Sequence, residues 1–207
     1  MRIGIVGYGN LGRSLELIAK EAEEIELTGV FTRRSTKDVK TFGVPVFSFF
    51  DIEQHADDVD VLCLCHGSSD DLPKYAPMLA EHFNTVDTFD NHAAIPDHKA
   101  RVDKVARDAR HTALVSLGWD PGFLSLIRLY SSSFIPGGCV NTFWGRGVSQ
   151  GHSEALRRIN GVKKAVQYTV PREDAVTLAG LVAHPFSDTD RHRRVCYVVA
   201  EKEERIS

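Results

Sequence analysis

A glycine-rich segment near the start of the chain, GYGNLG at residues 7–12, constrains the fold more than any other feature. It follows the short apolar run RIGIV and precedes a segment whose apolar residues have helical spacing, so it joins a strand to a helix. In this context the pattern G-x-G-x-x-G is typical of a dinucleotide-binding unit. Gly7 permits the tight turn, Gly9 lets the backbone approach a pyrophosphate, and Gly12 lets the helix pack closely on the strand. The helix N-terminus then presents free N–H groups to the phosphates; the alternative is a glycine-rich turn without a ligand.

The first 117 residues alternate between strand and helix patterns. We expect strands at residues 2–6, 25–31, 59–65, 84–89 and 112–116, and helices at residues 10–23, 71–82 and 96–110. In the first helix the apolar residues at helical spacing are Leu11, Leu15, Ile18 and Ala19. Such alternation favours an α/β fold with a parallel sheet, here a Rossmann-type dinucleotide-binding domain over residues 1–118.

The character of the sequence changes after GWDPG at residues 118–122. The next segment, FLSLIRLYSSSF, has the pattern of a helix. Beyond it lie a stretch rich in glycine and polar residues at 141–153, strand-like alternation at 164–170 and 193–200, and an irregular stretch at 172–192. We therefore expect a second domain over residues 119–207.

The composition is that of an ordinary globular protein, with 43% hydrophobic and 26% charged residues among 207. A net charge of −3, and no apolar run of about 18 residues or more, predict neither a nucleic-acid partner nor a membrane span. The four cysteines, Cys63, Cys65, Cys139 and Cys196, have no zinc or C-x-x-C spacing. We therefore expect reduced thiols, no metal site and a cytoplasmic location.

Two arginines stand where an NAD-binding site places a carboxylate. The segment GVFTRR at residues 29–34 ends the second expected strand, one helix after the glycine-rich segment. A carboxylate there would accept a hydrogen bond from the ribose 2′-hydroxyl of NAD, whereas arginine would hold a 2′-phosphate. Thr32 adds a hydroxyl, and Arg33 and Arg34 each offer a bidentate guanidinium. The sequence therefore predicts NADP(H) as the cofactor; the alternative is a pair of solvated loop arginines.

The third strand-to-helix junction, CLCHGSSDD at residues 63–71, lies at the same carboxyl edge of the predicted sheet. Gly67 and Ser68 leave the sheet at this edge, where ligands of such folds bind, so both are candidates for cofactor contact. His66 has the chemistry of a general base, but a lone histidine at a strand end is more often structural. Both roles stay open for His66.

Polar side chains and tryptophans follow the next two strands. VDTFDNH carries Asp90, and GWDPG carries Trp119 and Asp120. The two aspartates can converge on a cationic group, while Trp119 and Trp144 can exclude water from a small substrate. The alternatives are that Asp120 caps a helix beginning at the next residue and that Asp90 stabilises a turn.

Six segments together resemble one family. VGYGNLGRS, FTRRST, VDTFDNH, LVSLGWDPGF, TFWGRGVSQGHSEALRRI and GVKKAVQYTVPREDA are similar to the meso-diaminopimelate D-dehydrogenases, from Gly4 to about Val199. Of these, WGRGVSQGHS and GWDPG are specific to the family, and the glycine fingerprint is not. The resemblance implies NADP-dependent, reversible oxidative deamination of meso-2,6-diaminopimelate at its D-centre. The products are ammonia and L-2-amino-6-oxopimelate, which cyclises to tetrahydrodipicolinate, and the reverse reaction supplies lysine and peptidoglycan synthesis.

The resemblance also implies a set of site residues. The cofactor pyrophosphate would meet Gly9, Asn10 and Leu11, and the 2′-phosphate would meet Thr32, Arg33 and Arg34. The rest of the cofactor would be flanked by Cys65, His66, Gly67, Ser68 and Phe89. The implied substrate pocket consists of Asp90, Trp119, Asp120, Trp144, Gln150, Gly151, Thr169 and Arg194. In it, Asp90 and Asp120 would hold the reacting ammonium, Thr169 and Arg194 would hold the distal carboxylate, and the general base stays open.

The chain departs from the family in two ways. Family members commonly have methionine where His66 stands, which weakens a catalytic role for this histidine. Family chains are also considerably longer than 207 residues, so we expect the α+β substrate and dimerisation domain at 119–207 to be incomplete. The family implies a homodimer.

Two alternatives to an active enzyme of this family remain. One is an inactive NADP-binding fragment of such an enzyme, and the other is a different Rossmann-fold oxidoreductase of lysine synthesis. Against the second, the chain has neither the SNC-like cysteine motif of semialdehyde dehydrogenases nor the paired His-and-Lys signature of dihydrodipicolinate reductase.

Overall fold

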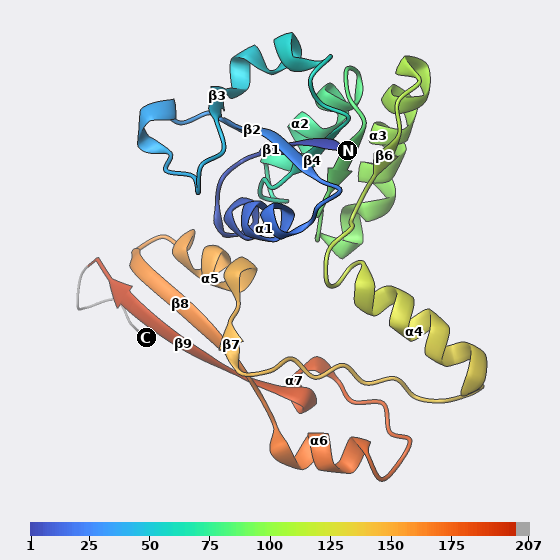
Figure 1. The fold of residues 1–207 in the computed structure, drawn as a ribbon. Coiled ribbons are helices and arrows are strands. Elements are labelled where there is room, and N and C mark those ends of the chain that lie inside the picture. The colour runs from blue at the N-terminus through green and yellow to red at the C-terminus, as the bar shows by residue number, and fades with distance from the viewer. Residues whose placement is uncertain (202–207) are drawn as a thin grey trace. The chain divides into compact units, whose positions relative to one another are not determined.

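A six-stranded parallel sheet organises the first part of the chain (Figure 1). The computed structural model describes residues 1–201, apart from the side chains of Gln150 and Asp188. The strands are β1 (Arg2–Val6), β2 (Glu26–Thr32), β3 (Val46–Ser48), β4 (Val61–Leu64), β5 (Thr85–Asp87) and β6 (Ala113–Leu114). They lie in the order β3-β2-β1-β4-β5-β6, and each pair is parallel. This is the doubly wound Rossmann order, in which ligands bind beyond the carboxyl ends of the strands where the order reverses, here between β1 and β4.

The helices of this part cover both faces of the sheet (Figure 1). They are α1 (Asn10–Glu21), α2 (Asp71–Ala80) and α3 (Ile95–Ala109), with short 3₁₀ helices η1 (Thr36–Asp38), η2 (Phe49–His55) and η3 (His92–Ala94). One hydrophobic core, which includes Ile5 and Val30, packs against α1. The other includes Leu72 of α2 and Val102 of α3. Each strand of the sheet centre is therefore buried on two sides, as its continuous apolar sequence requires.

The strands expected at 2–6, 25–31, 59–65, 84–89 and 112–116, and the helices expected at 10–23, 71–82 and 96–110, are confirmed as β1, β2, β4, β5, β6 and α1 to α3. The sequence did not predict β3, because three residues at a sheet edge are too few for a recognisable alternation.

Only some of the apolar residues at helical spacing in α1 turn toward the sheet. The helix buries Gly12 and Ala19, whereas Leu11 and Ile18 are 43% and 66% exposed. Gly12 explains the difference, because a Cβ at this position would lie 2.3 Å from the carbonyl oxygen of Gly7. The helix turns its glycine toward the strand, and this close approach sets which side chains face outward.

The next helix, α4 (Phe123–Phe134), covers the segment that the sequence predicted as helical. The chain divides into two compact units, Met1–Leu129 and Tyr130–Ser207, so the division falls within α4. The boundary expected at residue 118 lies before this helix and stays a prediction. Among residues 1–201, no helix has both the length and the apolar character needed to cross a membrane.

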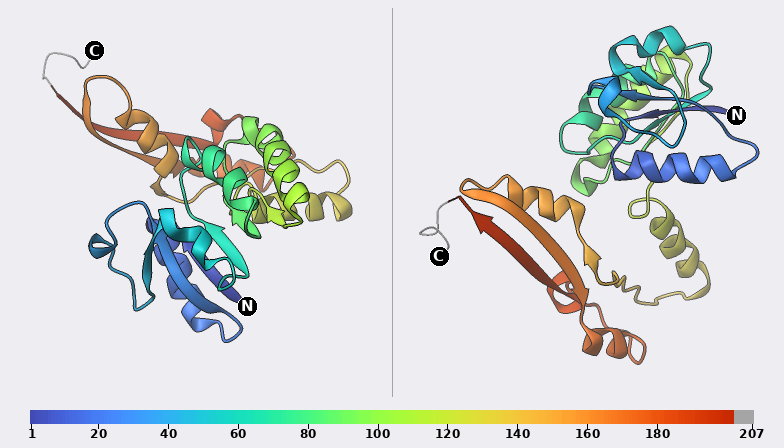
Figure 2. Two further views of the ribbon diagram at one scale, coloured as in Figure 1. Left: turned by 90° about the horizontal axis from the view of Figure 1, so that it is seen from above. Right: turned by 60° about the vertical axis from the view of Figure 1, so that its left-hand side comes forward.

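The second unit contains a three-stranded antiparallel sheet. Its strands are β7 (Gly147–Val148), β8 (Val162–Pro171) and β9 (His192–Ala200), in the order β7-β8-β9. Figure 2 shows α5 (Gln150–Arg157) lying along β8. The two longer strands confirm the alternation expected at 164–170 and 193–200.

Three helices of the second unit were not expected. They are α5, α6 (Glu173–Ala179) and α7 (Asp188–Arg191); α5 begins in the glycine-rich stretch at 141–153, and the other two lie in the irregular stretch at 172–192. Each has eight residues or fewer, which is too short for apolar periodicity to be distinguished from a loop.

Candidate functional site

The three glycines of the loop between β1 and α1 differ in how closely other atoms surround them. Gly7 has a φ of +90°, and a Cβ there would lie 2.6 Å from the ring of His66. Gly12 faces the carbonyl oxygen of Gly7, as described above. At Gly9 an added Cβ would meet nothing within 4 Å. Gly9 is also the residue before α1 and has no side chain to cap the helix, so the loop has the open backbone that a pyrophosphate requires.

A buried carboxylate on α1 is hydrogen-bonded to a side chain of this loop. Glu16 of α1 is fully buried and accepts hydrogen bonds from the hydroxyl of Tyr8 and, at 2.8 Å, from the backbone N–H of Phe42. Burial, followed by the hydrogen bond to Glu16, raises the pKa of Tyr8 to about 12. The sequence analysis missed Glu16, since a glutamate on a helix is usually solvated. The only available signal was its position four residues after Gly12, on the side that packs on the sheet.

The two arginines at the end of β2 make different contacts. The guanidinium of Arg34 donates to the backbone carbonyl of Tyr8 at 2.8 Å, and its backbone N–H donates to Oγ1 of Thr32 at 3.2 Å. Arg33 pairs with Asp71 at 2.7 Å and lies over the ring of Tyr75, 5.2 Å from its centroid. Arg34 therefore lies beside the glycine loop, whereas Arg33 is paired with α2, and their contact with a 2′-phosphate stays a prediction.

His66 follows β4, beside the glycine loop. Its ring contacts Phe49 and Tyr75 at centroid distances of 5.9 Å, and it lies against Gly7. Burial lowers the pKa of His66, and its Nδ1 is buried without a hydrogen-bond partner among the described residues. Burial also raises the pKa of the neighbouring Cys65 thiol to about 12. These surroundings favour the packing alternative for His66 over the general base.

The loops after β4 and β5 meet through Ser68 and Asp90. The backbone N–H of Asp90 donates to Oγ of Ser68 at 3.1 Å, and the Asp90 side chain is exposed. Phe89, by contrast, is 1% exposed and stacks on His98 at a centroid distance of 4.1 Å. Of the two neighbours, Asp90 faces outward at the carboxyl edge and Phe89 packs inward, so the cofactor contact expected of Phe89 stays a prediction.

Asp120 and Trp119 follow β6, the neighbour of β5 in the sheet. The carboxylate of Asp120 pairs with the guanidinium of Arg128, which lies on α4. Trp119 is 60% exposed and packs beside Phe123, with ring centroids 5.3 Å apart. Because parallel strands end at one edge, Asp120 and Asp90 emerge from neighbouring positions of this edge.

In the second unit, Thr169 of β8 and Arg194 of β9 are directly opposite in the antiparallel sheet. Side chains opposite one another lie on the same face, so the two residues expected to hold one carboxylate are adjacent. Gly147 of β7 pairs with Thr169 on its other side and has no side chain to cover it there. The backbone N–H of Trp144 donates to Nε2 of His192 at 2.8 Å, so Trp144 is tied to β9 two residues before Arg194.

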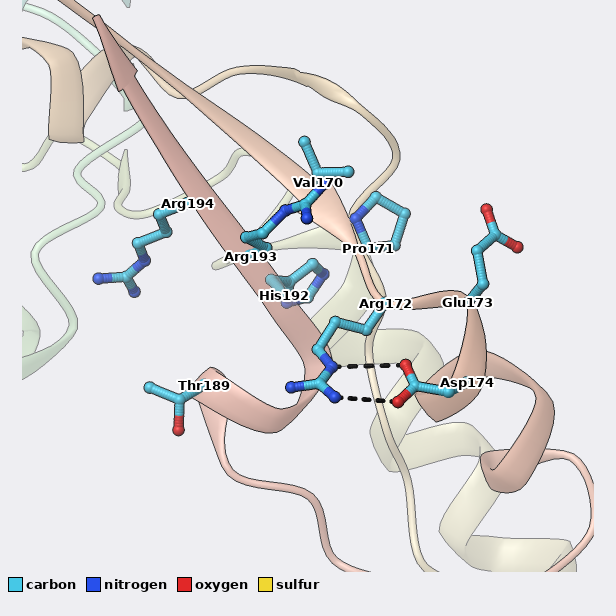
Figure 3. Close-up of a pocket in the computed structure, with 9 residues that line it drawn as sticks. All are labelled: Val170, Pro171, Arg172, Glu173, Asp174, Thr189, His192, Arg193 and Arg194. Atoms are coloured by element: carbon cyan, nitrogen blue, oxygen red, sulfur yellow. Dashed lines mark hydrogen bonds and ion pairs between the residues drawn. The ribbon is translucent and has the colours of Figure 1, made fainter.

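A cavity of about 770 Å³ lies at the end of this sheet (Figure 3). It is lined by Val170, Pro171, Arg172, Glu173, Asp174, Thr189, His192, Arg193 and Arg194. Figure 3 shows Arg194 extending away from β9, whereas Arg172 is paired with Asp174 at 2.9 Å. Gly151 is open, since an added Cβ would meet nothing within 4 Å, and the Gln150 side chain lies outside the described part of the structure. Within that part, no three metal-ligating side chains come together.

The comparisons with known proteins agree across both units. The sequence profile of the diaminopimelic acid dehydrogenase C-terminal domain matches residues 118–206. A meso-diaminopimelate D-dehydrogenase of Corynebacterium glutamicum is 50% identical over 202 residues, which are 97% of this chain and 62% of that protein. The crystal structure of C. glutamicum DAP dehydrogenase in complex with DAP has a TM-score of 0.87 and 48% identity, and covers 97% of this chain and 62% of its own. An engineered D-amino acid dehydrogenase bound to NADP⁺ has a TM-score of 0.84 at 48% identity, with the same coverage.

Proposed function

Because the chain belongs to the meso-diaminopimelate D-dehydrogenase family, we propose that it takes part in the NADP-dependent oxidative deamination of meso-2,6-diaminopimelate at its D-centre. The products would be ammonia and L-2-amino-6-oxopimelate, which cyclises to tetrahydrodipicolinate. The observation that carries the proposal is the 50% identity to a relative of this name over 97% of the chain, which includes both units. The chain spans 62% of the length of that relative, so the activity of the whole protein is part of the proposal.

NADP⁺ is the cofactor that these residues suit. The open backbone at Gly9 would receive the pyrophosphate, and Arg33 and Arg34 would receive the 2′-phosphate as charge-assisted pairs. Thr32 would add its hydroxyl, and Asn10 and Leu11 would offer the first N–H groups of α1. The neighbour bound to NADP⁺ supports this choice. When bound, the nicotinamide supplies the hydride acceptor.

At the reacting end, Asp90 and Asp120 would hold the substrate ammonium and orient its Cα–H bond. This ammonium must first lose one proton, which leaves a lone pair on the amine nitrogen. As the Cα–H bond then breaks with its electron pair, the lone pair forms a C=N bond and the nitrogen gains positive charge, which the two carboxylates would stabilise. Water then adds to the carbon, and the C–N bond breaks to release ammonia. Arg128 pairs with Asp120 and would hold that carboxylate in one orientation.

At the distal end, Thr169 and Arg194 would hold the carboxylate of the L-centre, with arginine making a bidentate pair. Trp119, Trp144, Gln150 and Gly151 would form the walls of the pocket. Selection of the D-centre is then geometric, because only that end would direct its hydrogen at the nicotinamide. We also carry over from the family a homodimer, a cytoplasmic location, and a place in lysine and peptidoglycan precursor synthesis.

A second candidate function is NADP binding without turnover. The two candidates differ in one measurement, since both require NADP⁺ binding and only the first requires catalysis.

The test is NADPH formation by the purified chain with NADP⁺ and meso-diaminopimelate, followed by absorbance. We expect turnover with this pair, and none with the L,L isomer or with NAD⁺ at the same concentrations. If NADP⁺ binds without turnover, the second candidate is correct. If a folded chain neither binds NADP⁺ nor turns over, both candidates are wrong.

A further inference from the structure

A single buried carboxylate joins the two loops that carry the candidate catalytic aspartates. Asp87 is the last residue of β5 and is 2% exposed. Its Oδ1 accepts hydrogen bonds from the backbone N–H of Phe89 at 3.0 Å and from that of Ser116 at 2.8 Å. Its backbone carbonyl accepts from the N–H of Leu117 at 2.8 Å. Phe89 precedes Asp90, so both loops are tied to one residue at the carboxyl edge of the sheet.

The second oxygen of this carboxylate is held by a histidine from α3. Nε2 of His98 lies 2.7 Å from Oδ2 of Asp87, and His98 is fully buried. The His98 ring stacks on Phe89 with an interplanar angle of 17°. Its Nδ1 is buried and has no hydrogen-bond partner within the described part of the chain. Asp87 and His98 thus form a polar pair inside an apolar layer.

Burial of such a pair is a weak source of stability. Desolvation of an acid and a histidine offsets most of their mutual attraction, and well-packed apolar side chains of the same size are often as stable. The unpartnered Nδ1 adds a further desolvation penalty. A gain in stability therefore does not explain why an acid and a histidine are buried here. The hydrogen bonds that Asp87 accepts from the two loops explain it better.

The backbone conformation of Ser116 also indicates that Asp87 orders the loop after β6. Ser116 has a φ of +59°, in the left-handed region that residues other than glycine rarely adopt. Its N–H is bonded to Asp87, so the carboxylate holds Ser116 in the conformation that directs the chain toward Trp119 and Asp120.

We propose that Asp87 and His98 are positioning residues, which fix the loop of Asp90 and the loop of Asp120 relative to each other. The proposal rests on the function proposed above, in which those two aspartates hold one ammonium group. A carboxylate that bonds both loops, and is itself held by a packed ring, keeps the two charged groups at a set separation before the substrate arrives.

The experiment compares His98→Leu with His98→Gln, since glutamine keeps an N–H that can reach Asp87 and leucine does not. With the full chain we expect His98→Leu to lower kcat for meso-diaminopimelate about tenfold to a hundredfold, with little change in KM for NADP⁺. His98→Gln should recover most of kcat. The control is His111→Leu, because His111 lies before β6 at the opposite end of the sheet and bonds the carbonyl of Ala80 at 3.2 Å. It should lower Tm without changing kcat.

The proposal is wrong if His98→Leu and His111→Leu lower kcat alike, or if His98→Gln restores Tm and not kcat. Absence of turnover in the unmodified chain would instead contradict the proposed function. In that case amide hydrogen exchange decides the positioning role. His98→Leu should then speed exchange at the N–H groups of Phe89 and Ser116 and leave that of Cys65, which bonds Val6 at 2.8 Å, unchanged. Unchanged exchange at Phe89 and Ser116 would overturn the proposal.

Discussion

The two units of the chain are stabilised in different ways. In the first, a parallel sheet is covered on both faces, and side chains such as Phe31 and Leu72 are fully buried. In the second, the buried hydrophobic residues within the described range are Ala165 and Ala175, while Tyr197 and Val199 of β9 are 62% and 52% exposed. The candidate cofactor residues are therefore supported by a packed interior. Thr169 and Arg194, the candidates for binding the distal carboxylate, are supported mainly by strand pairing. The first site should keep its shape by itself, and the second should respond more to its surroundings.

The largest expected effect tests this contrast directly. Leu72→Ala removes a fully buried side chain of the first unit, and we expect it to lower the free energy of unfolding by about 2–5 kcal/mol. Leu181→Ala is the matched change in the second unit, where the side chain is 75% exposed, and its effect should stay within about 0.5 kcal/mol. Urea unfolding followed by circular dichroism measures both. Equal losses would show that the second unit has a core of its own.

The sequence was sufficient to predict most of the first unit. Strands β1 and β4 are apolar runs, the glycine loop gives the start of α1, and β3 is too short to be recognised. The orientation of α1 was not predictable from apolar spacing, because close backbone approach at Gly12, rather than hydrophobic burial, decides which face turns inward. In the second unit, strands long enough to alternate were predicted and the short helices were not.

The candidate site likewise has residues that the sequence predicts and contacts that it does not. The glycines and arginines were predictable because phosphate binding places fixed residue types at a fixed distance from a strand. The supporting contacts were not predictable, because Glu16 bonds a residue 26 positions away and Asp71 pairs with one 38 positions away. The partner of His98 is 11 positions away but lies on a strand, whereas His98 lies on a helix. Sequence spacing carries no record of such contacts, and only the fold brings these partners together.

A second comparison lies within the glycine loop. Gly12→Ala would place a Cβ 2.3 Å from the carbonyl oxygen of Gly7, and the overpacking should lower the free energy of unfolding by about 1–3 kcal/mol. Gly9→Ala meets nothing within 4 Å, so it should leave unfolding unchanged and weaken NADP⁺ binding by crowding the pyrophosphate. Urea unfolding and calorimetric NADP⁺ titration separate the two effects. Normal NADP⁺ affinity in Gly9→Ala would place the pyrophosphate elsewhere.

The third comparison replaces one arginine of each unit by alanine. Arg33→Ala should weaken NADP⁺ binding about tenfold and leave NAD⁺ binding unchanged, because a charge-assisted pair with the 2′-phosphate is lost. Arg194→Ala should instead raise KM for meso-diaminopimelate about tenfold, with NADP⁺ affinity unchanged. Calorimetry and steady-state kinetics on both variants provide the measurement. If either variant weakens both ligands equally, the assignment of Arg33 to the cofactor and of Arg194 to the substrate is wrong.

The smallest expected effect is a pH dependence that belongs to the first unit. Burial lowers the pKa of His66 in the folded chain, so below its ordinary value of about 6.5 the unfolded chain binds more protons at this residue than the folded chain does. Stability then rises with pH across that window, and the contribution of His66 is lost as pH falls through it. His66→Met removes the titrating group at similar volume, so it should flatten the decline in unfolding free energy between about pH 6.5 and pH 5 and change little at about pH 8. Urea unfolding at these pH values measures the slope. An unchanged slope in His66→Met would mean that another group of the first unit controls its acid sensitivity, and that the contact of His66 with Gly7 does not exclude water from the ring.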